Sequence, residues 1–250
     1  MDGCKLSIIT VCHNEVLGIR HTAESIINQD YKEFEWIVID GGSNDGTLEV
    51  LYEYKHRTTH LISGQDKGIY DAMNIGASKA KGEYLLFLNG GDSLYKIDTL
   101  SACSDYLEKT DVLHGGIQVV SESGQCVQEK QFFDSDITVE NMTYRTLPHQ
   151  GLFMSRILFQ MLGGFDLGFA IISDRDLTSR AYVGGASFRS IPFVVSNYVL
   201  GGVSNTQKAA VRKESGKFMR KYFFKLWIFD TLRAWFHEIV MATKSTLGLK

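Results

Sequence analysis

Three groups of polar residues, each at the end of an apolar run, are the first places in this sequence where chemistry could occur. They combine imidazole, amide and carboxylate groups, which bind phosphates, sugar hydroxyls and metal ions or transfer protons. The groups are His13-Asn14-Glu15, Asp40 with Ser43-Asn44-Asp45, and Asn89-Gly90-Gly91-Asp92.

Asp40 ends the apolar segment FEWIVID. Its carboxylate is expected at the rim of a sheet, where it could accept hydrogen bonds from a base or a ribose. A local alternative exists for its neighbours, because Ser, Asn and Asp are good N-caps and a helix is predicted from Thr47. Capping accounts for one of Ser43, Asn44 and Asp45, but Asp40 lies too far upstream for it.

Asp92 follows the apolar run YLLFLN after two glycines. Glycines allow a tight turn and the close approach of a bulky ligand. An exposed, rigidly mounted acid in such a turn is suited to a hard divalent cation that also binds phosphate oxygens. An ordinary turn aspartate is the alternative, and this residue alone does not decide between them.

Asp174 and Asp176 lie in the segment GFAIISDRDLTSR, where an apolar run leads into a predicted helix. Ser173 with Asp176 resembles a capping box, and acids are favourable at a helix N-terminus. The functional alternative is a general base at the edge of a pocket, which typically contributes about 10²–10⁴-fold in rate.

These residues depend on an alternation of strands and helices in the first ninety residues. Strands are predicted over 5–12, 34–40, 60–63 and 83–89, and helices over 15–28, 47–54 and 68–79. This alternation predicts an α/β fold with a mostly parallel central sheet and helices on both faces. Ligands bind at the carboxyl ends of the strands in such sheets, so the three polar groups should share one edge.

The pattern is less regular after Asp92. Helices are predicted over 98–108, 155–162 and 173–183, strands over 112–120, 151–154 and 186–195, and a hairpin over 118–133. Residues 206–244 are predicted to be mainly helical. We expect two parts, a catalytic domain over 1–205 and a basic amphipathic helical tail over 206–250.

Composition places the chain among ordinary globular proteins, with 250 residues, 44% hydrophobic and 22% charged. The four cysteines form no zinc or CxxC spacing, and neither a signal peptide nor an 18-residue apolar run is recognisable. We therefore expect a cytoplasmic protein. Dinucleotide, P-loop and common hydrolase motifs are also missing, because no GxGxxG, GxxxxGK[ST], GxSxG or HExxH pattern occurs.

Charge is distributed unevenly. Residues 205–250 hold ten Lys/Arg and three acids, whereas the rest of the chain is acidic. Over 217–242, aromatic and aliphatic residues alternate with cations, which favours an interfacial helix on an anionic membrane. A helix packed on the domain and a homodimer interface are the alternatives. A nucleic-acid partner is not expected, because the body is acidic and the cations of the tail form no stripe.

Four segments together resemble the family 2 glycosyltransferases, which are inverting enzymes of the Rossmann-like GT-A fold. They are SIITVCHNE, EWIVIDGGSNDGT, DKGIYDAMNIGASKAKGEYLLFLNGGD and HQGLF…GGFD…ISDRDL. The resemblance covers roughly residues 5–205, with the segments in the expected order and spacing. The first three are especially similar to bacterial enzymes of exopolysaccharide assembly, such as the colanic acid type.

The resemblance implies a role for each matching position. It implies nucleobase and ribose binding by the backbone of Thr10 and Val11 and by Asp40, a metal ligand at Asp92 and a catalytic base at Asp174. The remaining donor-binding positions would be Asn14, Asp66, Lys67, Asn74 and Gly91, and the acceptor side would hold His149, Gln150 and Asp176. Two departures matter: Asp92 is a lone acid at the metal motif, and Ser173-Asp174 replaces a usual Glu-Asp pair. The second leaves Asp174 and Asp176 as alternatives for the base, with Asp174 favoured.

The implied activity is inverting transfer of a sugar from a nucleotide-diphosphate sugar, usually a UDP-sugar, to an acceptor hydroxyl, with Mn²⁺ or Mg²⁺. The acceptor would be a lipid-linked glycan of exopolysaccharide, capsule or lipopolysaccharide assembly, at the inner face of the cell membrane. A non-catalytic nucleotide-sugar-binding protein remains an alternative. A nucleotidyltransferase is a second one, although CHNEVLGIR does not fit the basic Gly-rich loop of those enzymes.

Overall fold

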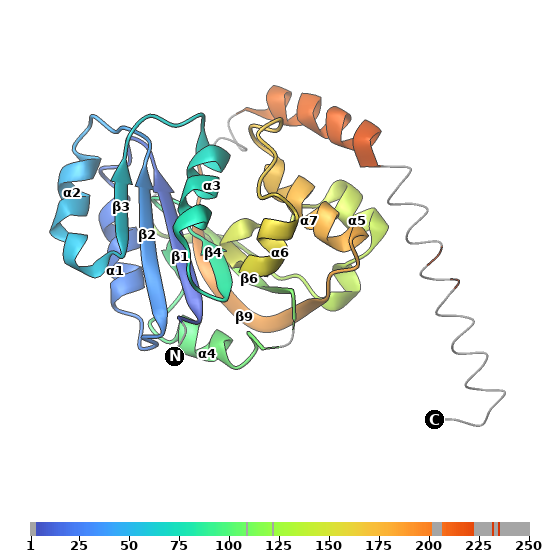
Figure 1. Cartoon of the computed structure of the whole chain (residues 1–250), viewed down its shortest axis with the longest axis horizontal. Coiled ribbons are helices and arrows are strands. Elements are labelled where there is room, and N and C mark those ends of the chain that lie inside the picture. The colour runs from blue at the N-terminus through green and yellow to red at the C-terminus, as the bar shows by residue number, and fades with distance from the viewer. Residues whose placement is uncertain are drawn as a thin grey trace.

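The computed structural model describes residues 4–108, 110–121, 123–201 and 207–222, together with Leu232 and Trp235. In this part of the chain one sheet of nine strands, in the order β3-β2-β1-β4-β8-β6-β9-β5 with β7 beside β6, forms the centre. Figure 1 shows helices on both faces of this sheet.

The first half of the chain builds four adjacent parallel strands. The strands are β1 (Leu6–Cys12), β2 (Phe34–Asp40), β3 (His60–Ser63) and β4 (Tyr84–Phe87), connected by the helices α1 (Ile19–Ile27), α2 (Thr47–Glu53) with the 3-10 turn η1 (Lys55–Arg57), and α3 (Ile69–Lys79). Cys12 pairs with Asp40 and Asp40 with Ser63, so these three strands end at one edge. The predicted parallel order is confirmed here.

The second half adds strands of both directions. Its elements are β5 (Ser93–Leu94), α4 (Thr99–Ser104), β6 (Val112–Val120), β7 (Cys126–Lys130), η2 (Asp134–Asp136), α5 (Val139–Tyr144), η3 (His149–Gly151), β8 (Leu152–Ser155), α6 (Arg156–Met161), α7 (Ser173–Val183) and β9 (Phe188–Val199). β8 is antiparallel to β4 and β6, whereas β9 is parallel to β6. β6 and β9 therefore run in the same direction as β1–β4.

Both faces of β1 are buried, because its side chains alternate between two cores. Ile9 and Val11 face a core that contains the apolar side of α3 and residues of α5, α6 and α7. Leu6 and Ile8 face the second core, which contains the apolar sides of α1, α2 and α4. A strand covered on both faces explains the continuous apolar run in the sequence.

Four elements differ from the sequence prediction. α1 begins at Ile19 rather than near Glu15, because the amides of Glu15 and Val16 donate to the side chains of Thr47 and Asp45 instead of starting a helix. β9 extends to Val199, four residues beyond its predicted end, since it continues to pair with β6 as far as Val120. α5 and the two-residue β5 were not predicted, and short elements of this kind carry little periodicity.

A C-terminal helix over 208–222 packs on the body, where Figure 1 shows it (orange-red) lying above α7. Phe218 is fully buried and Tyr222 is 6% exposed, and both belong to the core that contains α3 and α7. These two apolar side chains are therefore covered by the domain, while membrane contact through the exposed cations of the helix stays a prediction. Residues 223–231, 233–234 and 236–250 lie outside the described residues, so the rest of the predicted tail stays a prediction.

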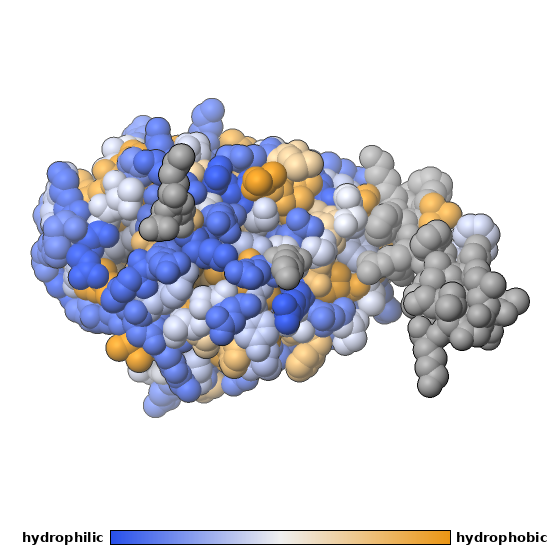
Figure 2. All heavy atoms as spheres, turned by 60° about the horizontal axis from the view of Figure 1, so that its bottom comes forward, coloured by the Kyte–Doolittle hydropathy of each residue, from blue (hydrophilic) through white to orange (hydrophobic). Residues whose placement is uncertain are grey.

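Within the described residues, no helix is long and apolar enough to cross a membrane. The face shown in Figure 2 is hydrophilic over most of its area, and apolar side chains form small separate groups on it. That face therefore offers no broad apolar surface.

Gly76 provides a test of how tightly α3 packs on β1. A Cβ atom at this position would lie 2.5 Å from Cγ2 of Ile9 and 3.4 Å from Cγ1 of Ile39, and both isoleucines are buried. Overpacking costs about 1–3 kcal/mol, partly offset by a helix propensity gain of about 1 kcal/mol for Ala over Gly. We expect Gly76→Ala to unfold at lower urea concentration than the wild type.

Gly216→Ala is the matched control, because a Cβ there would approach only the end of the Arg220 side chain, at 3.7 Å. This variant should be as stable as the wild type or up to about 1 kcal/mol more stable. Equal stability of the Gly76 variant and the wild type would show that α3 does not pack as described.

Candidate functional site

The loops after β1 and β2 are joined to each other by side chains at the carboxyl edge of the sheet. The amide of Asn14 donates to Oγ of Ser43 over 2.8 Å, and Oδ1 of Asn14 accepts from the amide of Asn44 over 2.9 Å. Asn14 has a φ of 52°, a left-handed conformation that asparagine tolerates. Of the three capping candidates, Asp45 bonds the first residue of α2, through the amide of Thr47. Asn14, expected among the donor-binding residues, thus holds this edge together.

Asp40 is the last residue of β2 and so lies at the edge of the sheet, as expected, but its side chain is fully buried. Its carboxylate accepts hydrogen bonds from the amides of Gly42 and Ser43, from the hydroxyl of Ser43, and from Oγ of Ser63 over 2.6 Å. Asp40 therefore shapes its own loop and ties it to β3. Binding of a base or ribose by Asp40 stays a prediction.

Thr10 and Val11 are also buried, and part of their hydrogen-bonding capacity is already used. Oγ1 of Thr10 accepts from Nε1 of Trp36 over 3.0 Å. The carbonyl of Val11 accepts from the amide of Gly90 over 2.8 Å and so connects β1 to the loop after β4. Nucleobase contact through their backbone groups stays a prediction.

Asp66 and Lys67 lie beside the same edge, in the loop after β3. A Cβ atom on Gly41 would lie 2.8 Å from Oδ2 of Asp66 and 3.4 Å from Nδ1 of His13, so these side chains gather around Gly41. Lys67 is exposed. The predicted donor-binding positions Asp66 and Lys67 are therefore adjacent to the β1 and β2 loops.

Asn74 has a different role from the one expected. Its Nδ2 donates to the carbonyl of Phe165 and its Oδ1 accepts from the amide of Phe165, both over 2.9 Å. This two-point contact attaches α3 to the segment that leads to α7. Because the carboxamide is already paired in this way, the structure does not support Asn74 as a residue that lines the donor site.

Asp92 is only 4% exposed, so the expectation of an exposed acid is wrong. Oδ2 accepts from Nε2 of Gln150 over 3.1 Å, and Oδ1 accepts from the amide of Val199 over 3.0 Å. Burial raises the pKa of Asp92 to about 6. The side chain thus joins the loop after β4 to η3 and to the end of β9.

Gly91 precedes Asp92 in a left-handed conformation with a φ of 93°. Its amide donates to Oγ1 of Thr22 over 2.9 Å. A Cβ atom here would lie 3.2 Å from Oε1 of Glu15, so the carboxylate of Glu15 lies beside the glycine turn. The turn therefore requires glycine for its conformation, and donor binding at Gly91 stays a prediction.

His149 and Gln150 connect the two predicted aspartates through adjacent side chains on η3. Gln150 bonds Asp92, whereas Nδ1 of His149 lies 3.5 Å from Oδ2 of Asp174. Nδ2 of Asn89 lies 3.2 Å from Nε2 of the same imidazole. An amide donor at Nε2 leaves the ring proton on Nδ1, where it faces Asp174. Gln150 is 4% exposed, so it supports Asp92 rather than bordering an acceptor as predicted.

Asp174 lies at the start of α7 with 14% of its side chain exposed. Oδ1 accepts from the amide of Arg175 over 2.8 Å, and it lies 3.2 Å from the hydroxyl of Tyr70. A small pocket adjoins it, lined by Phe87, Leu147, His149, Leu152, Met154, Phe165, Leu177 and Thr178. A partly exposed carboxylate that is contacted by the amide of Arg175, the ring of His149 and the hydroxyl of Tyr70, beside an apolar pocket, is suited to proton transfer.

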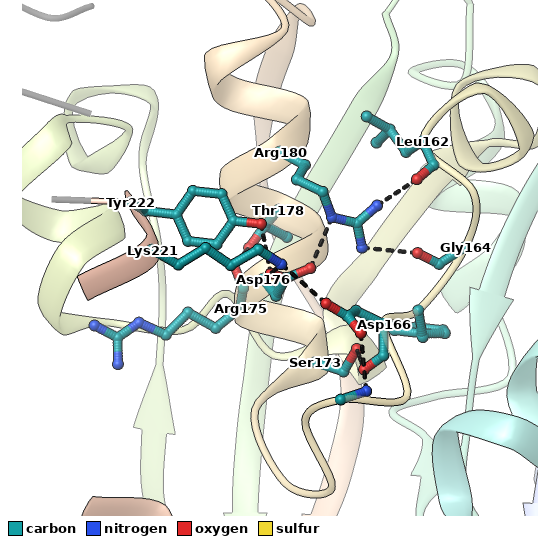
Figure 3. A network of polar contacts seen from close by, with 12 residues as sticks. Leu162, Gly164, Asp166, Ser173, Arg175, Asp176, Thr178, Arg180, Lys221 and Tyr222 are labelled. Atoms are coloured by element: carbon teal, nitrogen blue, oxygen red, sulfur yellow. Dashed lines mark hydrogen bonds and ion pairs between the residues drawn. The ribbon is translucent and has the colours of Figure 1, made fainter. Parts of the chain in front are cut away.

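Asp176 is fully buried and has no access to an acceptor, so that expectation is wrong. It accepts from Nε of Arg180 over 2.7 Å, from Nζ of Lys221 over 3.2 Å and from the hydroxyl of Tyr222 over 2.7 Å (Figure 3). The expected capping box is not formed, since Oγ of Ser173 donates to the carbonyl of Asp166. Burial thus favours Asp174 over Asp176 as the base.

The described side chains do not form a site that would hold a metal ion by themselves. No group of three His, Cys, Asp or Glu residues with suitable geometry occurs among them. Both oxygens of Asp92 already accept hydrogen bonds from the protein. The predicted metal ligand therefore has no free, exposed oxygen in this conformation.

Tyr70 was missed as a functional candidate. Tyr70 is only 5% exposed. Its hydroxyl donates to the carbonyl of Ile171 over 2.7 Å and contacts Asp174. Burial raises the pKa of Tyr70 well above its ordinary value. A tyrosine on the buried side of a helix needs a hydrogen-bond partner. This requirement could have marked Tyr70 as a candidate from the sequence, although the sequence does not reveal which residue is its partner.

Burial of Asp92 leads to a prediction about stability and pH. The unfolded chain loses this proton near pH 4 and the folded protein near pH 6, so the contribution of Asp92 to stability falls as pH rises between them. Two pH units correspond to about 3 kcal/mol. Asp92→Asn keeps the shape without the charge, since the amide of Gln150 can rotate to accept.

We expect the free energy of unfolding of the wild type, relative to Asp92→Asn, to fall by about 3 kcal/mol between pH 4 and pH 7. Urea unfolding of both proteins at several pH values measures this difference. A difference that does not change with pH would contradict the burial of an ionisable carboxyl at this position.

Comparison with known proteins agrees with this architecture. The family described as glycosyl transferase family 2 matches residues 7–161. A PGL/p-HBAD biosynthesis glycosyltransferase of Mycobacterium tuberculosis is 32% identical over 214 residues, which cover 80% of this chain and 79% of the relative.

Two solved structures share the fold. TarS 1–349 of S. aureus in complex with UDP has a TM-score of 0.65 at 21% identity, over 79% of this chain and 61% of TarS. The mannosyltransferase PcManGT of Pyrobaculum calidifontis, in complex with GDP-Man and Mn²⁺, has a TM-score of 0.61 at 19% identity, over 80% of this chain and 58% of the other. The chain thus spans about three fifths of these structures, and by sequence and fold it belongs to glycosyl transferase family 2.

Proposed function

We propose that this glycosyltransferase transfers a sugar from a UDP-sugar to an acceptor hydroxyl with inversion, and that Asp174 is its general base. The observation that carries the proposal is the carboxylate of Asp174, partly exposed at a pocket and oriented by His149, Tyr70 and the amide of Arg175. Asp174 lies outside the segment matched by the family, so its assignment depends on this geometry.

Asp174 would act on the acceptor. Its carboxylate accepts the proton of the acceptor hydroxyl while that oxygen forms a bond to the anomeric carbon. The bond between the anomeric carbon and the diphosphate oxygen breaks on the opposite face, so the configuration inverts without a covalent enzyme intermediate. Nδ1 of His149 and the hydroxyl of Tyr70 keep the carboxylate oriented. A base that is already oriented lowers the entropic cost of reaching the transition state.

The donor would bind along the edge where the loops after β1, β2 and β3 meet. Asp66 lies at this edge beside His13, and the exposed ammonium of Lys67 is suited to a phosphate. TarS is described with UDP and with UDP-GlcNAc, and PcManGT with GDP-Man. These neighbours support a nucleotide-sugar donor, and we propose uridine as its base.

A divalent cation, Mn²⁺ or Mg²⁺, enters the proposal as a ligand of the donor diphosphate rather than as a resident ion. The support is that Asp92 is enclosed by Gln150 and Val199, while PcManGT is described with Mn²⁺. Magnesium is commonly bound by one or two carboxylates together with substrate phosphates. We therefore expect cation binding to require the nucleotide.

The acceptor part of the proposal is a lipid-linked glycan of exopolysaccharide, capsule or lipopolysaccharide assembly at the inner face of the cell membrane. Mycobacterial relatives are named glycosyltransferases of PGL/p-HBAD biosynthesis, which supports a role in the biosynthesis of a glycosylated product. Two cations of the C-terminal helix, Lys217 and Lys221, contact Gly168 and Asp166, so membrane contact is proposed for the remaining cations of the tail. A homodimer stays a prediction.

Calorimetric titration with UDP tests the donor site. We expect the protein to bind UDP more tightly with Mn²⁺ than without it, and to give no heat with Mn²⁺ alone. Lys67→Ala should weaken UDP binding about tenfold, because a charge-assisted phosphate contact is worth about 1.5–3 kcal/mol. Lys79→Ala, at the far end of α3, is the control. Failure of the wild type to bind UDP would contradict the choice of uridine.

Replacement of Asp174 by Asn tests the base. The release of UDP from UDP-glucose, UDP-galactose and UDP-N-acetylglucosamine identifies a donor that the wild type turns over. With that donor, kcat should fall about 10²–10⁴-fold, because the amide cannot accept the proton, and the Kd for UDP should stay within about twofold.

Asp105→Asn is the matched control, since Asp105 is exposed at the end of α4 on the other face of the sheet. Near-normal turnover by Asp174→Asn would contradict the assignment of the base. Loss of UDP binding in that variant would place Asp174 in the donor site instead.

A further inference from the structure

The loop over 166–172 leads directly to Asp174 and lies against the C-terminal helix over 208–222. This helix was expected to be an appendage, yet four of its side chains bond the loop or the first turns of α7. They are Glu214, Lys217, Lys221 and Tyr222. The helix is therefore part of the structure that supports the candidate base.

The carboxylate of Glu214 accepts hydrogen bonds from three consecutive backbone amides of this loop. Oε1 accepts from the amide of Ala170 over 2.8 Å, and Oε2 accepts from those of Ile171 and Ile172 over 3.0 Å and 3.2 Å. Ile172 is the N-cap residue of α7, which has no side-chain cap of its own. An acidic group is favourable at this position, because unpaired amides and the helix dipole both attract negative charge.

Both the amide and the carbonyl of Ile171 are hydrogen-bonded. Its amide donates to Glu214, and its carbonyl accepts from the hydroxyl of Tyr70 over 2.7 Å. The same hydroxyl lies 3.2 Å from Oδ1 of Asp174. A short chain of contacts thus runs from Glu214 through Ile171 and Tyr70 to the carboxylate of the base.

The helix that carries Glu214 is anchored independently of Glu214. Phe218 is fully buried beneath the guanidinium of Arg175, whose Cζ lies 4.3 Å from the centre of the ring. Lys221 bonds Asp166 over 2.9 Å, and both Lys221 and Tyr222 bond the buried Asp176 (Figure 3). These contacts fix the place of the helix, so Glu214 has a fixed position from which to hold the loop.

We propose that Glu214 is a positioning residue for Asp174, and that the helix over 208–222 supplies it to the catalytic domain. This inference depends on the proposed function, in which Asp174 is the base. Without the carboxylate of Glu214, three amides before α7 lose their acceptor, and the loop is free to move Ile171, Tyr70 and Asp174 away from the acceptor. Donor binding lies at the loops after β1–β3 and does not involve this contact.

The test compares Glu214→Gln with the wild type in UDP release and UDP binding. The neutral amide offers one acceptor oxygen to three amides and places an NH₂ group against the loop. We expect kcat to fall about 10- to 100-fold, as displacement of a catalytic group by about 1 Å does. The KM for the UDP-sugar and the Kd for UDP should stay within about twofold. Glu214→Asp, which keeps the charge, should retain more kcat than Glu214→Gln.

Hydrogen exchange gives a reading that does not depend on activity. Amides 170–172 should exchange faster in Glu214→Gln, while those of β1 and β4 stay as protected as in the wild type. Lys213→Ala is the control, because Lys213 is the exposed neighbour of Glu214 on the same helix. If Glu214→Gln fails to fold, the same measurements on Glu214→Asp serve the comparison.

Normal kcat in Glu214→Gln would overturn the inference, and so would a parallel loss of kcat and UDP affinity, which indicates general damage to the fold. Failure of the proposed function looks different. In that case the wild type would release no UDP, or Asp174→Asn would turn over normally, while the exchange of amides 170–172 would still respond to Glu214→Gln.

Discussion

A carboxylate removed from water must find hydrogen-bond donors, and this requirement organises the structure around the candidate site. Leaving one buried charge without its partner costs about 3–5 kcal/mol. Asp40, Asp92 and Asp176 are all at most 4% exposed. Each accepts from at least one donor in a segment far away in the sequence, so each fixes a connection between distant parts of the chain.

The three connections lie in different parts of the candidate site. Asp40 ties the loop after β2 to Ser63 at the end of β3, and Asp92 ties the loop after β4 to η3 and β9. Asp176 ties α7 to the C-terminal helix. Asp174 differs from these carboxylates because part of it faces solvent at a pocket. In this fold the buried aspartates connect the segments of the candidate site, and the partly exposed one is the proposed base.

Strand positions in the first half were predictable because strands that are buried on both faces are continuous apolar runs, and β1–β4 lie within two residues of their expected ends. The burial of Asp92 and Asp176 was not predictable from the sequence. It depends on donors such as Gln150 and Tyr222, which are 46 or more residues away. Phe218 illustrates a second limit. Its helical spacing predicted an apolar face, but periodicity does not say whether a membrane or the protein itself covers that face.

The place of the C-terminal helix also bears on the order in which a newly made chain can assemble the candidate site. A chain is synthesised from its N-terminus at about 5–20 residues per second, so its N-terminal part is the first that can fold. β1–β4 and Asp174 are all translated before Glu214, Phe218 and Tyr222. A nascent chain can therefore pair its first strands while the loop before α7 still lacks its carboxylate. If Glu214 positions Asp174 as proposed, full activity also requires that residues 208–222 have been synthesised and have packed against α7 and the loop before it.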